Sequence, residues 1–135
     1  MKQLLIAFLL STSSIVLAQE KFLALTIIPK SEGKSLKNFT VLVSCEEGVD
    51  FTLTSRKKKM IFYLSAGLDY KLVVTKNGYY QSNYQIDLTD VPKALYQDNF
   101  LSHQLDVELV PKSKQQPTII HTYFYETRYG KLKNK

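Results

Sequence analysis

The sequence predicts an all-β fold, an antiparallel sandwich of seven or eight strands that a signal peptide precedes. Apolar and polar residues alternate with a period of two along most of the chain after residue 20, which is typical of half-buried strands. Polar and glycine-containing turns separate these segments, and no long segment has a helical period. Aromatic residues make up 12% of the chain, with nine Tyr and seven Phe, and both types favour the pleated surface of a sheet. A closed barrel is the structural alternative.

The first 19 residues are typical of a secretory signal peptide. Met1-Lys2 gives a short positive start, and an unbroken apolar run follows over residues 4–10. The residue types at Val16 and Ala18 suit a signal peptidase, so we expect cleavage after Ala18 or Gln19. A membrane anchor is the alternative, but the apolar run is shorter than the roughly 20 residues of a spanning helix. The sequence therefore predicts an exported protein, periplasmic, at the cell surface or secreted, that does not span the membrane after signal removal.

Eight segments are expected to form strands, because each combines an apolar pattern with turn residues beside it. They span residues 22–28, 39–45, 50–54, 60–64, 70–74, 80–88, 105–109 and 118–125. The first is apolar on both faces and should be covered on both sides, and Pro29 ends it because proline cannot donate to a ladder. Phe51 and Leu53 are expected to point inward. Asn77-Gly78 predicts a hairpin, since both residues tolerate a positive φ.

One folded domain is expected after the signal peptide, with the sandwich over residues 20–111. Residues 112–135 are expected to form a C-terminal extension with an extra strand and a frayed basic tail from residue 128. Residues 93–97 lie in the long connection between the predicted strands at residues 80–88 and 105–109. They are expected to form one helical turn at most.

Positive charge is the main electrostatic feature of the chain, with a formal net charge of +6. This charge favours acidic surfaces such as anionic glycans or lipid headgroups. The run Arg56, Lys57, Lys58, Lys59 is expected at an exposed hairpin tip. There it either is solvated and keeps a strand edge from pairing, or contacts an anionic ligand. Nucleic acid is not expected as the partner of an exported protein.

Cys45 is the one cysteine of the chain, so an internal disulfide is excluded. It lies in phase with Val41 and Val43, which predicts burial. Pairing with another chain is the alternative in an oxidising compartment.

Patterns that carry catalysis or metal binding are missing from the sequence. The two histidines, His103 and His121, are far apart, and no Gly-x-Ser-x-Gly, phosphate-loop or dinucleotide motif is present. Glu46, Glu47 and Asp50 form an acidic turn that we expect to be solvated rather than to hold Ca²⁺. The sequence therefore predicts no catalytic residues, no cofactor and no metal.

Tyrosines provide a second candidate binding surface. Some of the tyrosines in alternating strands must face outward, and exposed Tyr beside Asn and Gln can stack on sugars or anchor a protein partner. The alternative is that they fill the ends and edges of the sandwich. The predicted binding surface consists of Tyr80, Tyr84, Tyr123, Tyr125, Arg56, Lys57 and Lys58.

Residues 22–88 resemble a carboxypeptidase regulatory-like domain. The similarity rests on SLKNFTV at residues 35–41, FYLSAGLDY at residues 62–70 and KNGY at residues 76–79. Gly67 and Gly78 permit the turns of this pattern, and Tyr70 and Tyr79 can close the ends of the sandwich while their hydroxyls reach a partner. The resemblance implies a transthyretin-like, immunoglobulin-like sandwich of a bacterial envelope protein. It also implies a role as a folding aid, spacer or binding module.

The predicted function is non-catalytic. We expect an exported β-sandwich module that acts in protein interaction or scaffolding in the bacterial cell envelope, with an envelope or outer-membrane protein as partner. The alternative is a carbohydrate-binding module that holds a glycan with exposed tyrosines.

Overall fold

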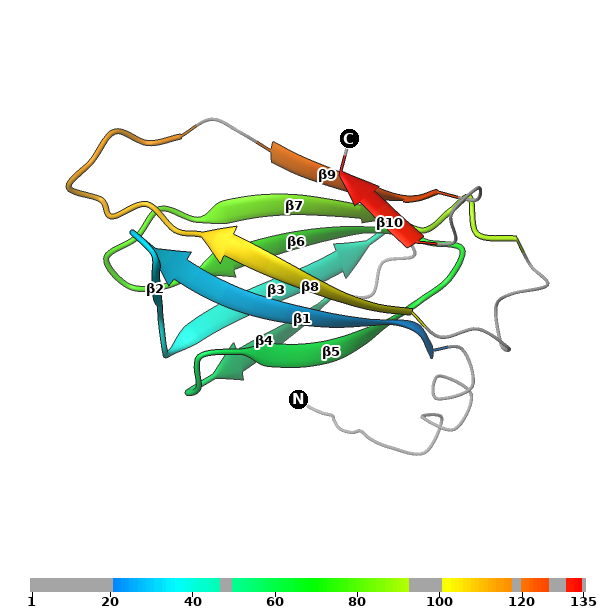
Figure 1. Cartoon of the computed structure of the whole chain (residues 1–135), viewed down its shortest axis with the longest axis horizontal. Coiled ribbons are helices and arrows are strands. Elements are labelled where there is room, and N and C mark those ends of the chain that lie inside the picture. Colours follow the sequence, from blue (N-terminus) through cyan, green and yellow to red (C-terminus); the bar gives the residue numbers. More distant parts are fainter. Residues whose placement is uncertain (1–20, 47–49, 93–100, 118–119, 127–130, 135) are drawn as a thin grey trace.

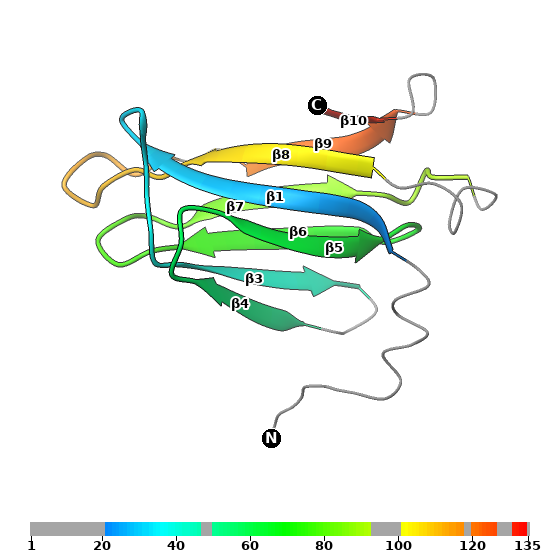
Figure 2. The ribbon, with the colours of Figure 1, turned by 60° about the horizontal axis from the view of Figure 1, so that its bottom comes forward.

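Two facing sheets form a β-sandwich in the computed structural model, which describes residues 21–46, 50–92, 101–117, 120–126 and 131–134 (Figures 1 and 2). The expected signal peptide and the helical turn at 93–97 lie outside these residues. The strands are β1 Lys21–Ser31, β2 Lys34–Ser35, β3 Phe39–Cys45, β4 Phe51–Ser55, β5 Met60–Ser65, β6 Asp69–Thr75, β7 Ser82–Asp87, β8 Leu101–Glu108, β9 Ile120–Glu126 and β10 Lys131–Asn134. The predicted all-β sandwich is thereby confirmed.

The smaller sheet is built around β1, which pairs with β5 on one side, with β8 on the other, and with β2 at its end. The larger sheet has the order β10-β9-β7-β6-β3-β4. Two pairs, β1 with β8 and β7 with β9, are parallel, so the sheets are not purely antiparallel as predicted. A parallel pair needs a crossover connection. For β7 and β9 this crossover runs through β8, which lies between them in sequence and belongs to the opposite sheet.

The hydrophobic core lies between the two sheets and follows the predicted alternation. Tyr70, Leu72 and Val74 of β6 are all buried, and so are Tyr84, Ile86 and Leu88 at β7. In β1 the inward residues are fully buried, and Ala24 on the other face is only 8% exposed. The expectation that this strand is covered on both faces is therefore confirmed only for its first half, because Thr26 and Ile28 on the outer face are half-buried.

Three local expectations differ from the structure. Phe51 is 37% exposed rather than inward and covered, because β4 is the edge strand of a six-stranded sheet that faces a narrower one. Part of the tail that was expected to fray forms β10, which pairs with β9 and buries Leu132 to 7% exposure. Cys45 is half-buried rather than fully buried, because it lies at the end of β3.

Two turns show how the chain reverses at one end of the sandwich. Glu32 and Gly33 both have positive φ, at 52° and 82°, as a two-residue type I′ hairpin between β1 and β2 requires. In the Asn77-Gly78 turn only Gly78 has a positive φ, at 88°. β6 and β7 do pair as a hairpin, but the connection between them is not a type I′ turn. Residues 79 and 80 of this connection pair instead with the segment that follows β8.

Tyr70 ties the opposite end of the sandwich together, as the sequence pattern predicts. Its hydroxyl accepts a hydrogen bond from the Ser65 N–H at 3.0 Å and donates one to the Ser65 carbonyl at 3.3 Å. The ring is buried. One side chain thus fills the core and satisfies two backbone groups where β5 ends.

Candidate functional site

Five connections between strands meet at one end of the sandwich, on the left in Figure 1. We call these connections and the adjoining strand ends the basic end. Its cations are Lys30, Lys34, Lys37, Arg56, Lys57, Lys58, Lys59, Lys76, Lys112 and Lys114, and its carboxylates are Glu32, Asp106 and Glu108. Ten cations against three carboxylates is a larger excess than the net +6 of the whole chain. The positive charge of the protein is therefore concentrated at this end.

The three carboxylates of the basic end are engaged in local contacts. Asp106 Oδ2 lies 3.3 Å from Lys30 Nζ, and Glu32 pairs with Lys114. Glu108 accepts a hydrogen bond from the backbone N–H of Glu32 at 3.1 Å. The hydrogen bond from Lys114 is the largest of the influences that lower the pKa of the Glu32 carboxyl. These contacts leave the other cations of this end without a carboxylate partner among the residues that the structure describes.

A depression of about 470 Å³, the basic depression, lies among those cations. Its lining residues are Ile28, Ser35, Lys37, Arg56, Lys57, Lys58 and Lys59. The side chains of residues 56–59 are exposed. The five cationic side chains repel one another, but the surface that lines the depression is mainly apolar, so the charged ends are presented to solvent rather than into the depression.

Ser55 holds the backbone of the tip that carries residues 56–59. Its hydroxyl accepts a hydrogen bond from the Lys57 N–H at 3.0 Å and donates one to the Lys59 carbonyl at 2.9 Å. This is a local serine turn. Because only backbone groups of the lysines take part, their ammonium groups remain available to solvent or to a ligand.

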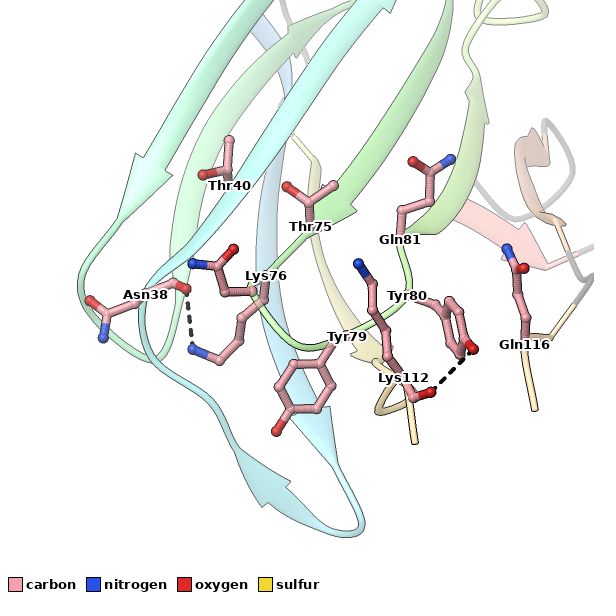
Figure 3. Close-up of a pocket in the computed structure, with 10 residues that line it drawn as sticks. Asn38, Thr40, Thr75, Lys76, Tyr79, Tyr80, Gln81, Lys112 and Gln116 are labelled. Carbon is pink, nitrogen blue, oxygen red and sulfur yellow. Dashed lines mark hydrogen bonds between the residues drawn. The ribbon is translucent and has the colours of Figure 1, made fainter. Parts of the chain in front are cut away.

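A second depression, the polar depression, has a volume of about 680 Å³. It shares no lining residue with the basic depression, and Lys37 and Asn38, which line one depression each, lie on the connection that crosses from one sheet to the other. Its lining residues are Asn38, Thr40, Thr75, Lys76, Asn77, Tyr79, Tyr80, Gln81, Lys112 and Gln116 (Figure 3). Amide, hydroxyl and ammonium groups therefore surround it, together with two tyrosine rings.

Two loops pair with each other to form one wall of the polar depression. The Tyr80 N–H donates to the Val110 carbonyl at 2.9 Å, and the Lys112 N–H donates to the Gly78 carbonyl at 3.0 Å. The Tyr80 hydroxyl also donates to the Lys112 carbonyl at 3.3 Å (Figure 3). The positions of both Tyr80 and Lys112 are thus set by the fold before any ligand arrives.

Lys76 fixes the opposite wall. Its ammonium group donates to the carbonyl of Lys37 and to that of Asn38 (Figure 3). Asn38 has a positive φ of 60°. The contact joins the β6–β7 connection to the β2–β3 connection.

The predicted binding residues separate into distinct places. Arg56, Lys57 and Lys58 are exposed together at the basic depression, and Tyr80 lines the polar depression. Tyr84 is only 4% exposed, so its prediction as a surface residue is wrong: it faces inward on β7, in phase with Ile86. Tyr123 is half-buried and packs against the core. The side chain of Tyr125 lies outside the part of the structure that is described.

Sequence reasoning missed Lys37, Lys76, Lys112 and Tyr79 as members of the site. They come from three connections that are distant in sequence and meet only through the topology. A usable signal exists in the sequence: successive antiparallel strands alternate in direction, so every second connection falls at the same end. Cations in the connections after β4, β6 and β8 could have been assigned to one end on that basis.

Both histidines contact tyrosine rings, and we call His103, His121, Tyr84 and Tyr123 the aromatic seam. His121 stacks on Tyr84 with ring centroids 4.7 Å apart, and His103 meets Tyr123 edge-on at 5.3 Å. Burial lowers the pKa of His103, and burial likewise raises the pKa of Tyr84. No group of three or more His, Cys, Asp or Glu residues within the described ranges could hold a metal ion.

The seam gives the stability of the fold a dependence on pH. Because burial disfavours the charged imidazole, the folded-state pKa of His103 lies below its ordinary value of 6.5. The unfolded chain then binds more protons as pH falls through 6.5, so stability is lost in that direction. We expect His103→Gln to show a shallower loss of unfolding free energy than the wild type between about pH 7.5 and pH 5.5.

Urea denaturation at three pH values in this window measures the effect. The difference between the two proteins isolates His103 from carboxylates that both of them share. Equal slopes for the wild type and the variant would show that His103 is as accessible to protons in the folded state as in the unfolded chain.

No helix in the described part of the chain is long and apolar enough to span a bilayer.

No family model and no curated protein matches the chain. A solved structure titled "Crystal Structure of S.CueP" is similar to it, with 20% sequence identity and a TM-score of 0.43. The match covers 67% of this chain and 62% of that one, which is less than two thirds of the CueP chain.

Proposed function

We propose that the protein is a non-catalytic, exported binding module that holds or scaffolds an acidic component of the bacterial cell envelope at its basic end. The observation that carries the proposal is the concentration of ten cations, against three carboxylates, on five connections at one end. Net repulsion among those cations opposes folding. A surface that keeps such a charge pattern is suited to an oppositely charged partner, whose approach it accelerates.

The architecture of the basic end supports a binding role. Loops displayed by a rigid sandwich are a common place for recognition residues. Here Ser55, Lys76 and Tyr80 hold the loops by side-chain hydrogen bonds. Little loop ordering is then left to oppose association.

Export and the cell envelope enter the proposal from the sequence. The signal-peptide pattern of the first 19 residues supports export, and the resemblance of residues 22–88 to carboxypeptidase regulatory-like domains supports an envelope role. Such domains are expected to act as spacers or binding modules beside a partner. An envelope protein and an envelope glycan are the two candidate partners.

Sedimentation with isolated cell envelopes of the source bacterium tests the proposal. We expect the purified protein to co-sediment, and the triple variant Lys57→Gln/Lys58→Gln/Lys59→Gln to bind at least about tenfold more weakly. Raising the NaCl concentration from about 50 mM to about 500 mM should weaken wild-type binding, because salt screens exposed charges.

The matched control removes three lysines elsewhere, as Lys71→Gln/Lys131→Gln/Lys133→Gln. These side chains are exposed and lie outside both depressions, so we expect a change of less than about twofold. Equal losses in both triple variants would indicate attraction by net charge alone. Wild-type binding by the Lys57–Lys59 variant would overturn the basic end as the binding site.

A further inference from the structure

The edge strand β4 lacks the features that usually protect a sheet edge from a further strand. Within the residues that the structure describes it pairs with β3 alone, and it lies at the margin of the larger sheet (Figure 2). Its sequence, FTLTS, contains neither a charged residue nor a proline. Half of the backbone N–H and C=O groups of such a strand point away from its neighbour, where they can pair with another chain.

Opposite charges flank this uncharged strand. Asp50 precedes it and Arg56 follows it. Both side chains are exposed, and neither forms an ion pair within the described part of the chain. Leu53 lies midway between them. If two copies of β4 pair antiparallel with Leu53 opposite Leu53, Asp50 of each copy therefore lies opposite Arg56 of the other.

We propose that β4 is the contact surface for a second copy of this chain, which pairs with it antiparallel about a two-fold axis through Leu53. A two-fold contact is self-complementary, so the dimer contains the contact between Asp50 and Arg56 twice. The larger sheets of the two copies then form one continuous sheet. The proposal concerns a surface other than the two depressions and goes beyond the proposed function.

The remaining side chains of β4 also match in this register. On the outer face, the Thr54 hydroxyl lies 3.3 Å from that of Thr40 on β3, and Thr52 of the second copy lies on its other side. Such cross-strand threonine pairs stabilise a sheet. On the inner face, Phe51 is 37% exposed and lies diagonal to Leu53 of the second copy. Dimerisation thus covers an apolar ring that the single chain leaves partly open to water.

The other edges of the two sheets fit a second copy less well. The strands β8 (LSHQLDVE) and β10 (KLKN) contain charged residues, which oppose pairing with another strand, and β2 is only two residues long. The strand β5 (MIFYLS) is uncharged, but residues 56–59 before it are cationic, and residues 66–68 after it are Ala, Gly and Leu. Antiparallel pairing of two β5 strands therefore brings no opposite charges together.

An extended segment of another protein is the alternative occupant of the β4 edge, since backbone groups alone can hold an added strand. The flanking charges favour the second copy. In an antiparallel pair it presents the same acid and the same base in reverse order, whereas a parallel pair would place like charges side by side.

Sedimentation equilibrium of the purified protein measures the dimer directly. A pair of five-residue strands is a small interface, so we expect a Kd on the order of 100 µM. Asp50→Arg and Arg56→Asp each turn both attractive contacts of the dimer into repulsive ones. We expect each single variant to raise the Kd at least about tenfold.

Two combinations of these substitutions should restore the dimer. The double variant Asp50→Arg/Arg56→Asp reverses both charges, and its Kd should lie within about threefold of the wild-type value. An equimolar mixture of the two single variants should form mixed dimers, although neither variant pairs with itself. Because both positions are exposed, every variant should keep the wild-type midpoint of urea unfolding, which controls for misfolding.

A wild-type protein that stays monomeric at about 1 mM overturns the proposal, because even a small specific interface should associate at that concentration. Attraction or repulsion by net charge alone predicts another pattern. Arg56→Asp lowers the positive charge of the chain, so it would then strengthen self-association. That result, or a double variant that dimerises as weakly as the single variants, also overturns the proposal.

Discussion

Replacing Tyr84 by Ala is expected to lower the free energy of unfolding by about 3–5 kcal/mol, the usual effect of truncating a buried aromatic residue. Tyr84 is 4% exposed, and its ring stacks on His121. The substitution would leave a cavity at the point where β7 pairs with β9. Urea denaturation monitored by circular dichroism gives the difference directly.

Tyr63→Ala is the matched control for this variant. Tyr63 is 46% exposed on β5, and truncation there should change stability by less than about 1 kcal/mol. The comparison tests where Tyr84 points. A Tyr84→Ala protein that kept wild-type stability but lost its binding to cell envelopes would show that the ring faces a partner rather than the core.

The placement of Tyr84 shows where sequence reasoning about the site fails. Its strand alternates clearly, so Tyr84 is in phase with Ile86 and Leu88, and the same alternation that predicts the strand also assigns Tyr84 to the core. The surplus of tyrosines in the chain favours the opposite prediction, an exposed binding surface. The structure follows the periodicity, because an aromatic ring on the inner face stabilises the fold by burial.

Features that depend on local pattern could be predicted well. The strand over β1 follows from its continuous apolar character, and the turns with positive φ at Gly67 and Gly78 follow from glycine itself. The early part of β8 was missed because Leu101 and His103 alternate with polar residues only briefly after a long connection. The strand β10 was missed because a short charged segment gains its stability from pairing with β9 and from burial of Leu132.

The basic end could not be predicted from any single segment. Its cations occur in groups of one to four that are separated by whole strands, and only the run at residues 56–59 is conspicuous in the sequence. Their assembly depends on strand direction, and the parallel pairing of β1 with β8 places the loop after β8 beside the β1–β2 turn. Pairing partners are a property of the tertiary fold, so the basic end and its two depressions emerge only from the structure.

The central position of β1 leads to the second large expected effect on stability. Leu25 is fully buried, and its neighbours in register are Phe62 on β5 and His103 on β8. We expect Leu25→Ala to lower the free energy of unfolding by about 2–5 kcal/mol, because removal of a large aliphatic side chain leaves a cavity that a strand paired on both sides cannot close.

Ile61→Ala provides the matched control for Leu25→Ala within the same sheet. Ile61 is 52% exposed on the outer face of β5, so its truncation should cost less than about 1 kcal/mol. Both variants keep the charges of the basic end, and at a temperature where both are folded they should bind cell envelopes as the wild type does.

If Leu25→Ala were no more destabilising than Ile61→Ala, β1 would not be the shared centre of the smaller sheet. The parallel pairing with β8 that helps to assemble the basic end would then be wrong as well.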